Sequence, residues 1–199
     1  MILKICGITN RDDAAAALDG GASAIGFNFY SGSPRYIDPE QAAEIPSAGA
    51  RRVGVFVNES RERVEAILRI AGLDTAQLHG EEAVADYPSG FAVWKTARVN
   101  EDFDPTAYTD CPVEALVLDG PAGELYGGAG VTFDWKRAAA MSKRIIVAGG
   151  LDASNVAQAI ATARPWGVDA CSRLESAPGR KDHQKMLAFL KAAKEALRA

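Results

Sequence analysis

The chain has 199 residues, and its 22 basic and 26 acidic residues give a net charge of −4. Its composition, 48% hydrophobic and 24% charged, argues against a disordered chain and suffices for one buried core without disulfides or a structural metal. The charge balance is not that of a nucleic-acid-binding protein, and no apolar run approaches the roughly 18 residues of a membrane span. We therefore expect one soluble domain over residues 1–199 that binds neither nucleic acid nor a membrane.

The first expected elements are strands. Short apolar or β-branched runs begin near residues 2, 23, 51, 75, 91, 115, 144 and 167; they read ILKIC, SAIGFNF, RRVGVFV, TAQLHG, FAVWKTA, ALVLDG, RIIVAGG and GVDACS. Their average spacing of roughly two dozen residues leaves room for a crossover helix between parallel strands. The chain thus reads as eight βα units.

Helix-like stretches separate most of these runs. Capping residues predict several helix starts, and glycines predict two helix ends: Asn10, Asp38, Asp152 and Asp182 for the starts, and Gly20 and Gly72 for the ends. The weakest helix falls in EDFDPTAYTDCPVE, which contains Pro105 and Pro112, so we expect the fifth helix to be short or missing. The pattern fits a compact (βα)8 barrel, and an open doubly wound sheet would read similarly.

Cysteine and histidine are scarce and scattered along the chain. Cys6, Cys111 and Cys171 are an odd number without CxxC spacing, and His79 and His183 are too few for a zinc cluster. This usage predicts a protein of the reducing cytoplasm without a bound metal. Nothing in the sequence indicates an oligomeric state.

In both architectures the active site forms at the carboxyl ends of the strands, and here those ends are polar. Cys6 follows the first strand, where a thiol is either deprotonated by nearby positive charge and helix N-termini or a small packed hydrophobe. Asp119 directly follows an apolar strand, where a buried carboxylate needs an interaction partner or a role in the chemistry. Its other possible role is to cap the following loop. Gln77 and His79 share one strand face, and His79 is either a site residue or a structural histidine.

Glycine-rich turns and one cation complete the candidate set. Gly128 and Gly130 lie in a turn after the sixth strand, and Gly149 and Gly150 follow the seventh. Barrels often bind phosphate with amides of late loops, although such turns also occur as plain loop geometry. Arg35 lies in the loop after the second strand, where it either clamps a substrate anion or is solvated.

In order, the motifs KICGIT, GFNFYSGSPRYI, GVFVN, QLHG, LVLDG, GGAGVTFDW, VAGGL and PGRKD resemble the phosphoribosylanthranilate isomerase family. The resemblance covers residues 2–182 and favours a single (βα)8 TIM-barrel catalytic domain over the open sheet. It implies a cytoplasmic enzyme of tryptophan biosynthesis that needs no cofactor. The expected reaction is the Amadori rearrangement of a small phosphorylated substrate, N-(5'-phosphoribosyl)anthranilate.

The resemblance also implies a role for each matching residue. Cys6 would be the general base and Asp119 the general acid, which requires a thiol that ionises and a carboxyl that holds its proton near neutral pH. Arg35 would hold the anthranilate carboxylate. The other expected substrate contacts are Gln77, His79, Gly128 and Gly130, and the expected phosphate contacts are Gly149, Gly150, Asp169, Ser172 and Arg173.

Two positions depart from the family pattern. Where the family usually reads DVSSGVE, this chain reads DACSRLE, so Arg173 replaces a glycine, and we expect its guanidinium to add a contact to the phosphate. Ala129 replaces a hydroxyl residue, which matters less because backbone amides would do the binding. Two alternatives stay open: a related phosphate-binding barrel, such as the histidine-pathway isomerase or the indole-forming synthase, and a catalytically silent barrel that binds a metabolite or a partner protein.

Overall fold

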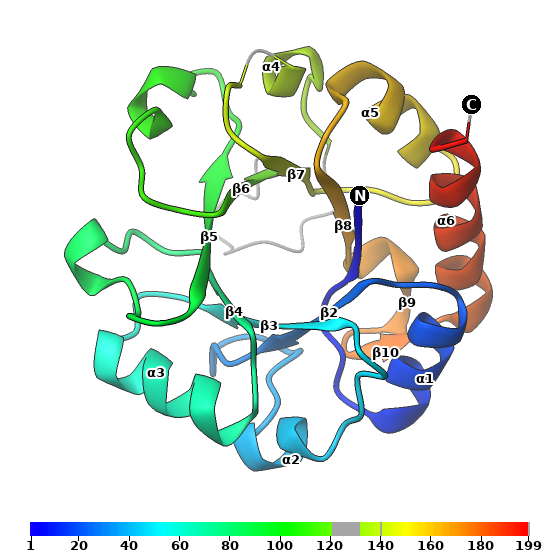
Figure 1. Cartoon of the computed structure of the whole chain (residues 1–199). Coiled ribbons are helices and arrows are strands. Elements are labelled where there is room, and N and C mark those ends of the chain that lie inside the picture. The colour runs from blue at the N-terminus through cyan, green and yellow to red at the C-terminus, as the bar shows by residue number, and fades with distance from the viewer. Residues whose placement is uncertain (121–131, 140, 199) are drawn as a thin grey trace.

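The computed structural model describes residues 1–120, 132–139 and 141–198. In this part of the chain, parallel strands β1 to β8 pair in sequence order and β8 pairs with β1, which closes a barrel (Figure 1). This confirms the barrel over the open sheet. The strands are β1 (Ile2–Ile5), β2 (Ala24–Asn28), β3 (Arg51–Phe56), β4 (Thr75–Leu78), β5 (Ala92–Arg98), β6 (Ala115–Asp119), β7 (Ile145–Val147) and β8 (Gly167–Ala170).

Helices cover the outside of the barrel, and α6 packs beside α1 and α5 where the barrel closes (Figure 1). No helix in the described ranges is long and apolar enough to cross a membrane. The α-helices are α1 (Arg11–Asp19), α2 (Pro39–Ala43), α3 (Arg61–Ile70), α4 (Lys136–Ala139), α5 (Val156–Ala163) and α6 (His183–Ala196).

The predicted helix caps are confirmed except at α5. The side chains of Asn10, Asp38 and Asp182 each accept a backbone N–H at the start of their helix. The prediction that Asp152 caps α5 is wrong, because α5 begins later and Asn155 occupies its cap position. Asp152 instead accepts the N–H of Ser154 at 2.8 Å within the preceding loop.

Two connections contain a short 3-10 helix where an α-helix would be usual. After β5 the chain forms only η2 (Pro105–Tyr108), which confirms the expected loss of the fifth helix. After β4 it forms only η1 (Val84–Asp86), a reduction that the sequence did not predict.

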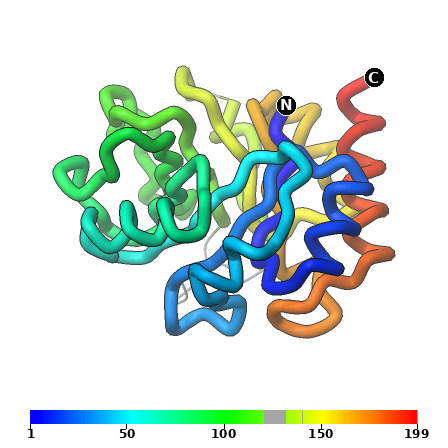
Figure 2. The backbone as a smooth tube through the Cα atoms, turned by 60° about the horizontal axis from the view of Figure 1, so that its bottom comes forward, coloured from blue at the N-terminus to red at the C-terminus, as the bar shows by residue number. Residues whose placement is uncertain are grey.

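A small antiparallel hairpin after β8 was also not predicted. It follows the 3-10 helix η3 (Ser172–Leu174) and consists of β9 (Glu175–Ala177) and β10 (Arg180–Lys181). Figure 2 shows both termini at one end of the barrel and this hairpin, in orange, at the other. The hairpin therefore lies at the end where the strands finish, which is the end that carries active sites in this fold.

The barrel interior changes from apolar to polar along the strands. Trp94 is fully buried inside the barrel, among small and β-branched side chains of the other strands. Residues two positions apart in a strand share a face, so Val117 is followed on the interior face by Asp119. Buried polar side chains on β1, β4, β6 and β8, namely Lys4, Gln77, Asp119 and Asp169, thus gather at the carboxyl ends of the strands.

Candidate active site

A cavity of about 270 Å³ opens at the carboxyl ends of the strands, close in size to pockets that hold small organic ligands. The structure brings ten of the twelve predicted site residues to this one cavity, and the other two, Gly128 and Gly130, lie outside the described residues. The ten are Cys6, Arg35, Gln77, His79, Asp119, Gly149, Gly150, Asp169, Ser172 and Arg173.

A buried ion pair lies beside Cys6. The ammonium of Lys4, on β1, is fully buried, and its Nζ is 2.7 Å from Oδ2 of Asp169 on β8. Burial alone would lower the pKa of Lys4, but Asp169 and Cys6 together raise it above its usual value, so this lysine stays charged. Gly26 on β2 makes the arrangement possible, because a Cβ there would lie 3.0 Å from both Nζ of Lys4 and Sγ of Cys6.

The surroundings of Cys6 favour its thiolate. A hydrogen bond from Cys171 lowers the pKa of Cys6 most, and the positive charges of Lys4 and Lys181 lower it further. Burial acts in the opposite direction, and the net pKa lies well below that of a free thiol. The thiol predicted as a base is therefore poised to ionise.

The carboxyl of Asp119 is perturbed in the opposite sense. Burial and, to a smaller extent, the negative charge of Cys6 raise the pKa of Asp119 to about 6, although the N–H of Gly120 partly offsets this by donating to the carboxylate. Asp119 therefore keeps a proton over part of the near-neutral range. The two pKa values are thus moved in opposite directions, and the base and acid roles of Cys6 and Asp119 stay predictions.

His79 lies next to Asp119 and is neutral. Its Nε2 is 3.7 Å from Oδ2 of Asp119, beyond hydrogen-bond distance, and has no other partner in the described part of the chain. Burial, together with the charges of Arg98 and Lys4, lowers the pKa of His79 to about 4. Gln77 donates from Nε2 to Oγ1 of Thr96 at 3.3 Å, which orients its amide in the cavity wall.

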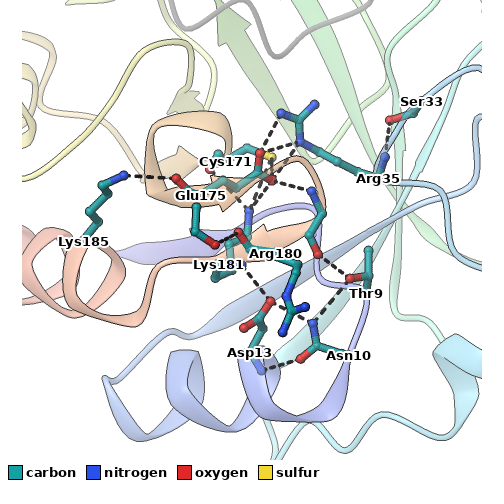
Figure 3. A network of polar contacts seen from close by, with 12 residues as sticks. Thr9, Asn10, Asp13, Ser33, Arg35, Cys171, Glu175, Arg180, Lys181 and Lys185 are labelled. Carbon is teal, nitrogen blue, oxygen red and sulfur yellow. Dashed lines mark hydrogen bonds and ion pairs between the residues drawn. The ribbon is translucent and has the colours of Figure 1, made fainter.

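Arg35 is held by a carboxylate from the unpredicted hairpin. Its Nε is 2.9 Å from Oε1 of Glu175, and its Nη2 is 2.8 Å from Oε2, which forms a bidentate pair (Figure 3). Lys181 contacts the same carboxylate, with Nζ 3.0 Å from Oε1. Because the pair uses two of the five guanidinium donors, Arg35 is fixed in place and still has donors for a second anion.

The two late loops approach each other at one side of the cavity. Gly149 and Gly150 have φ angles of 80° and 62°, which favour glycine. Asn155 ties this loop together by donating to the carbonyl of Gly150 at 2.8 Å and accepting from the N–H of Asp152 at 3.0 Å. Nη1 of Arg173 is 2.9 Å from Oδ2 of Asp152, so this arginine links the β8 loop to the β7 loop while it lines the cavity.

Three residues of the site were not singled out from the sequence: Cys171, Glu175 and Lys181. Cys171 directly follows β8, in the polar segment that ends this strand, and Lys181 belongs to the PGRKD motif, so both carried a signal. Glu175 carried none, because its partner Arg35 is 140 residues away in the chain.

A model of the N-(5'phosphoribosyl)anthranilate (PRA) isomerase family matches residues 3–192. A protein of Solibacter usitatus (strain Ellin6076) named N-(5'-phosphoribosyl)anthranilate isomerase is 67% identical, and the match covers all of both chains. The chain belongs to the N-(5'-phosphoribosyl)anthranilate isomerase family. It is accordingly an isomerase, and the resemblance seen in the sequence motifs is confirmed.

Solved structures of the phosphoribosylanthranilate isomerase family have the same fold. The crystal structure of the enzyme from Thermus thermophilus has a TM-score of 0.88 and 35% identity and covers 98% of this chain and 99% of its own. Another structure, with a TM-score of 0.85, 35% identity and coverage of 98% and 100%, contains a phosphoribosylanthranilate isomerase in complex with reduced 1-(o-carboxyphenylamino)-1-deoxyribulose 5-phosphate.

Proposed function

We propose that this isomerase acts in tryptophan biosynthesis and converts N-(5'-phosphoribosyl)anthranilate into 1-(2-carboxyphenylamino)-1-deoxyribulose 5-phosphate by an Amadori rearrangement. The observation that carries the proposal is that Cys6 and Asp119 line one cavity with pKa values moved in opposite directions. A base that ionises readily and an acid that keeps its proton are what this rearrangement requires.

The first step opens the ribose ring. Asp119 donates its proton to the ring oxygen as the C1–O bond breaks, and the lone pair of the anilino nitrogen forms a C1=N double bond. The neutral carboxyl of Asp119, with its pKa of about 6, is the form that can donate. The neutral imidazole of His79 beside it adds no positive charge that would favour loss of this proton.

The second step moves a proton from carbon. The Cys6 thiolate removes the C2 proton, and the electrons of that bond shift to give a C1=C2 enolamine. Loss of the C2 hydroxyl proton and protonation of C1 then give the ketone. C1 is reduced and C2 is oxidised within one molecule, so the balance requires no cofactor.

Arg35 is the proposed partner of the anthranilate carboxylate, because it lines the cavity and Glu175 fixes the orientation of its guanidinium. Gln77 and His79 form the cavity wall on the same proposal. Gly128 and Gly130, outside the described residues, stay predicted substrate contacts.

The phosphate is proposed to bind between the β7 and β8 loops. Gly149, Gly150 and Ser172 line the cavity there and would supply backbone amides and a hydroxyl, and Arg173 adds a positive charge beside them. Asp169 was expected near the phosphate, but its carboxylate pairs with Lys4 next to Cys6. We therefore assign Asp169 to holding Lys4, because a carboxylate repels a phosphate dianion.

We further infer that residues 1–199 act as one catalytic domain in the cytoplasm, where a reducing environment keeps Cys6 a free thiol. The test follows the loss of anthranilate-type fluorescence from freshly generated phosphoribosylanthranilate. A parallel assay offers the aldose-amine substrate of the histidine pathway. Turnover of the first substrate alone supports the proposal, turnover of the second alone points to the related barrel, and background rates with both point to a silent barrel.

A further inference from the structure

Cys171 lies beside Cys6 at the mouth of the barrel. Strands β1 and β8 pair with Ile5 opposite Ala170. The residues that directly follow the two strands, Cys6 and Cys171, are therefore neighbours. The N–H of Cys6 donates to the carbonyl of Ala170 at 3.0 Å, which fixes this register. Both residues line the cavity, which places the two thiols on the same side of the strand pair.

The Cys171 sulfur is enclosed on its other sides. A Cβ on Gly7, whose φ of 73° favours glycine, would lie 3.0 Å from Sγ of Cys171 and 2.9 Å from Cδ of Arg35. Glycine at position 7 thus lets Arg35 and Cys171 pack against the backbone. The Cys171 side chain therefore has little room to turn away from Cys6.

A charged network sets the direction of the Cys171 S–H group (Figure 3). The ammonium of Lys181 donates to the carbonyl of Cys171 at 3.3 Å and approaches its Sγ at 3.7 Å. Glu175 is a second acceptor for the thiol, with Oε1 at 3.8 Å, but Arg35 and Lys181 already donate to that oxygen at 2.9 and 3.0 Å. The Cys6 sulfur, on which Lys4 also acts, is the alternative acceptor beside the Cys171 thiol.

We propose that Cys171 is a positioning residue for the reaction: it donates its S–H to the Cys6 sulfur and holds that sulfur as a thiolate aimed into the cavity. This role depends on the proposed function, in which Cys6 takes the C2 proton. The family pattern DVSSGVE has a serine at this position, whose hydroxyl is also a donor, so both residue types supply a hydrogen-bond donor there.

Cys6 needs such a donor because its other charged neighbours oppose one another. The charged or titratable groups that act on it are Lys4 on its own strand, Asp119 on β6, Asp169 on β8, Arg35 after β2, Lys181 on β10 and Cys171 itself. The two carboxyl groups and burial disfavour the thiolate, whereas the cations favour it. A hydrogen bond to the charged form shifts this balance toward ionisation.

The experiment measures the ionisation of Cys6 without using turnover. Iodoacetamide alkylation is followed by mass spectrometry of the tryptic peptide that spans residues 5–11, which contains Cys6 as its single cysteine. Rates are measured from about pH 5 to about pH 10 for the wild type, Cys171→Ala, Cys171→Ser and Cys111→Ala. Cys111, which contacts Tyr87 at 3.6 Å and does not line the cavity, is the matched control.

Loss of the donor in Cys171→Ala is expected to raise the pH midpoint of Cys6 alkylation by about one unit, equivalent to roughly tenfold less thiolate below the midpoint. Cys171→Ser is expected to stay closer to the wild type than the alanine variant, and Cys111→Ala to match the wild type. The kcat of Cys171→Ala should fall near neutral pH and recover at higher pH, while its KM changes little.

An alanine midpoint equal to that of the wild type would overturn the proposal, as would a serine variant shifted as far as the alanine variant. If Cys171→Ala does not fold, Cys171→Val, which restores volume without a polar hydrogen, is judged by the same criteria. Failure of the proposed function gives a different result: the wild type would show no turnover of phosphoribosylanthranilate, or Cys6→Ala would retain it, whatever the alkylation midpoints of the Cys171 variants.

Discussion

The Lys4–Asp169 ion pair predicts a destabilisation that grows with pH. The perturbation is Lys4→Met, which keeps the volume of a fully buried side chain and removes the charge that lies 2.7 Å from the Asp169 carboxylate. Removing one partner of a buried pair costs about 3–5 kcal/mol when the other must stay charged. Asp169 can instead become neutral, because its pKa of about 7 allows it to take up a proton.

The direction of this pH dependence follows from the pKa of Asp169 in the folded and the unfolded chain. Burial raises this pKa to about 7 in the folded chain, above the unfolded value of about 3.9, so the folding penalty grows as pH rises from about 4. In the wild type the folding penalty stops growing near pH 7, because above that pH the Asp169 carboxyl also ionises in the folded chain, where Lys4 stabilises its charge. Without Lys4 the folded pKa moves higher, and the variant loses about 1.4 kcal/mol more for each pH unit above 7.

Cys6 adds to the same trend. Its pKa is lowered in the folded chain, so its thiolate contributes stability that is present at high pH and lost as pH falls through the folded value. Lys4 supplies part of that lowering. Loss of Lys4 therefore removes stability chiefly at the alkaline end, which makes about 1.4 kcal/mol per unit a lower estimate.

The assay is urea unfolding under reducing conditions at about pH 6, 7, 8 and 9. Lys191→Met, which removes a lysine whose side chain is 77% exposed, is the control and should change the free energy of unfolding by no more than about 0.5 kcal/mol at each pH. The double variant Lys4→Met/Asp169→Asn should lose most of the added pH dependence, because the carboxyl that Lys4 pairs with is gone and only the contribution of Cys6 remains. A difference between Lys4→Met and the wild type that is constant from pH 6 to pH 9 would refute the reasoning.

Three further predictions concern the cavity. Arg35→Lys should raise KM about tenfold with a smaller effect on kcat, because an ammonium cannot bind Glu175 and a substrate carboxylate in fork geometry; steady-state kinetics with an unchanged KM would contradict this. Proton NMR should show the ring of His79 neutral from about pH 5.5 to about pH 8, since burial lowers its pKa to about 4, and a midpoint near 6.5 would disprove its desolvation. Arg173→Gly should raise KM about tenfold through loss of a charge-assisted phosphate contact, whereas an unchanged or lower KM would assign Arg173 a structural role, to which its contact with Asp152 contributes.

The barrel could be predicted from the sequence because its strands are short apolar runs at regular spacing. All eight begin within one residue of the predicted position, since β-branched and apolar runs flanked by polar residues identify buried strands. The loss of the fifth helix followed from Pro105 and Pro112. The loss of the fourth did not, because nothing as distinctive as a proline pair marks the segment that forms Val84–Asp86.

The site could be predicted residue by residue but not as a set of contacts. The two-residue spacing of Lys4 and Cys6 is enough to put both on one strand face, yet the pairing of Lys4 with Asp169 depends on the register by which β8 closes against β1. The hairpin that carries Glu175 has strands of three and two residues, too short for a periodic signal. Its contribution to Arg35 thus became visible only in three dimensions.

The central claim is that Cys6 and Asp119 together move the protons of one rearrangement, and side-by-side turnover tests it most directly. Freshly generated phosphoribosylanthranilate is offered to the wild type, Cys6→Ala and Asp119→Asn at near-neutral pH, with folding checked by circular dichroism. We expect rapid loss of fluorescence with the wild type and kcat lowered by about 10²–10⁴ in each folded variant. Wild-type turnover in either folded variant would contradict the assignment of that residue.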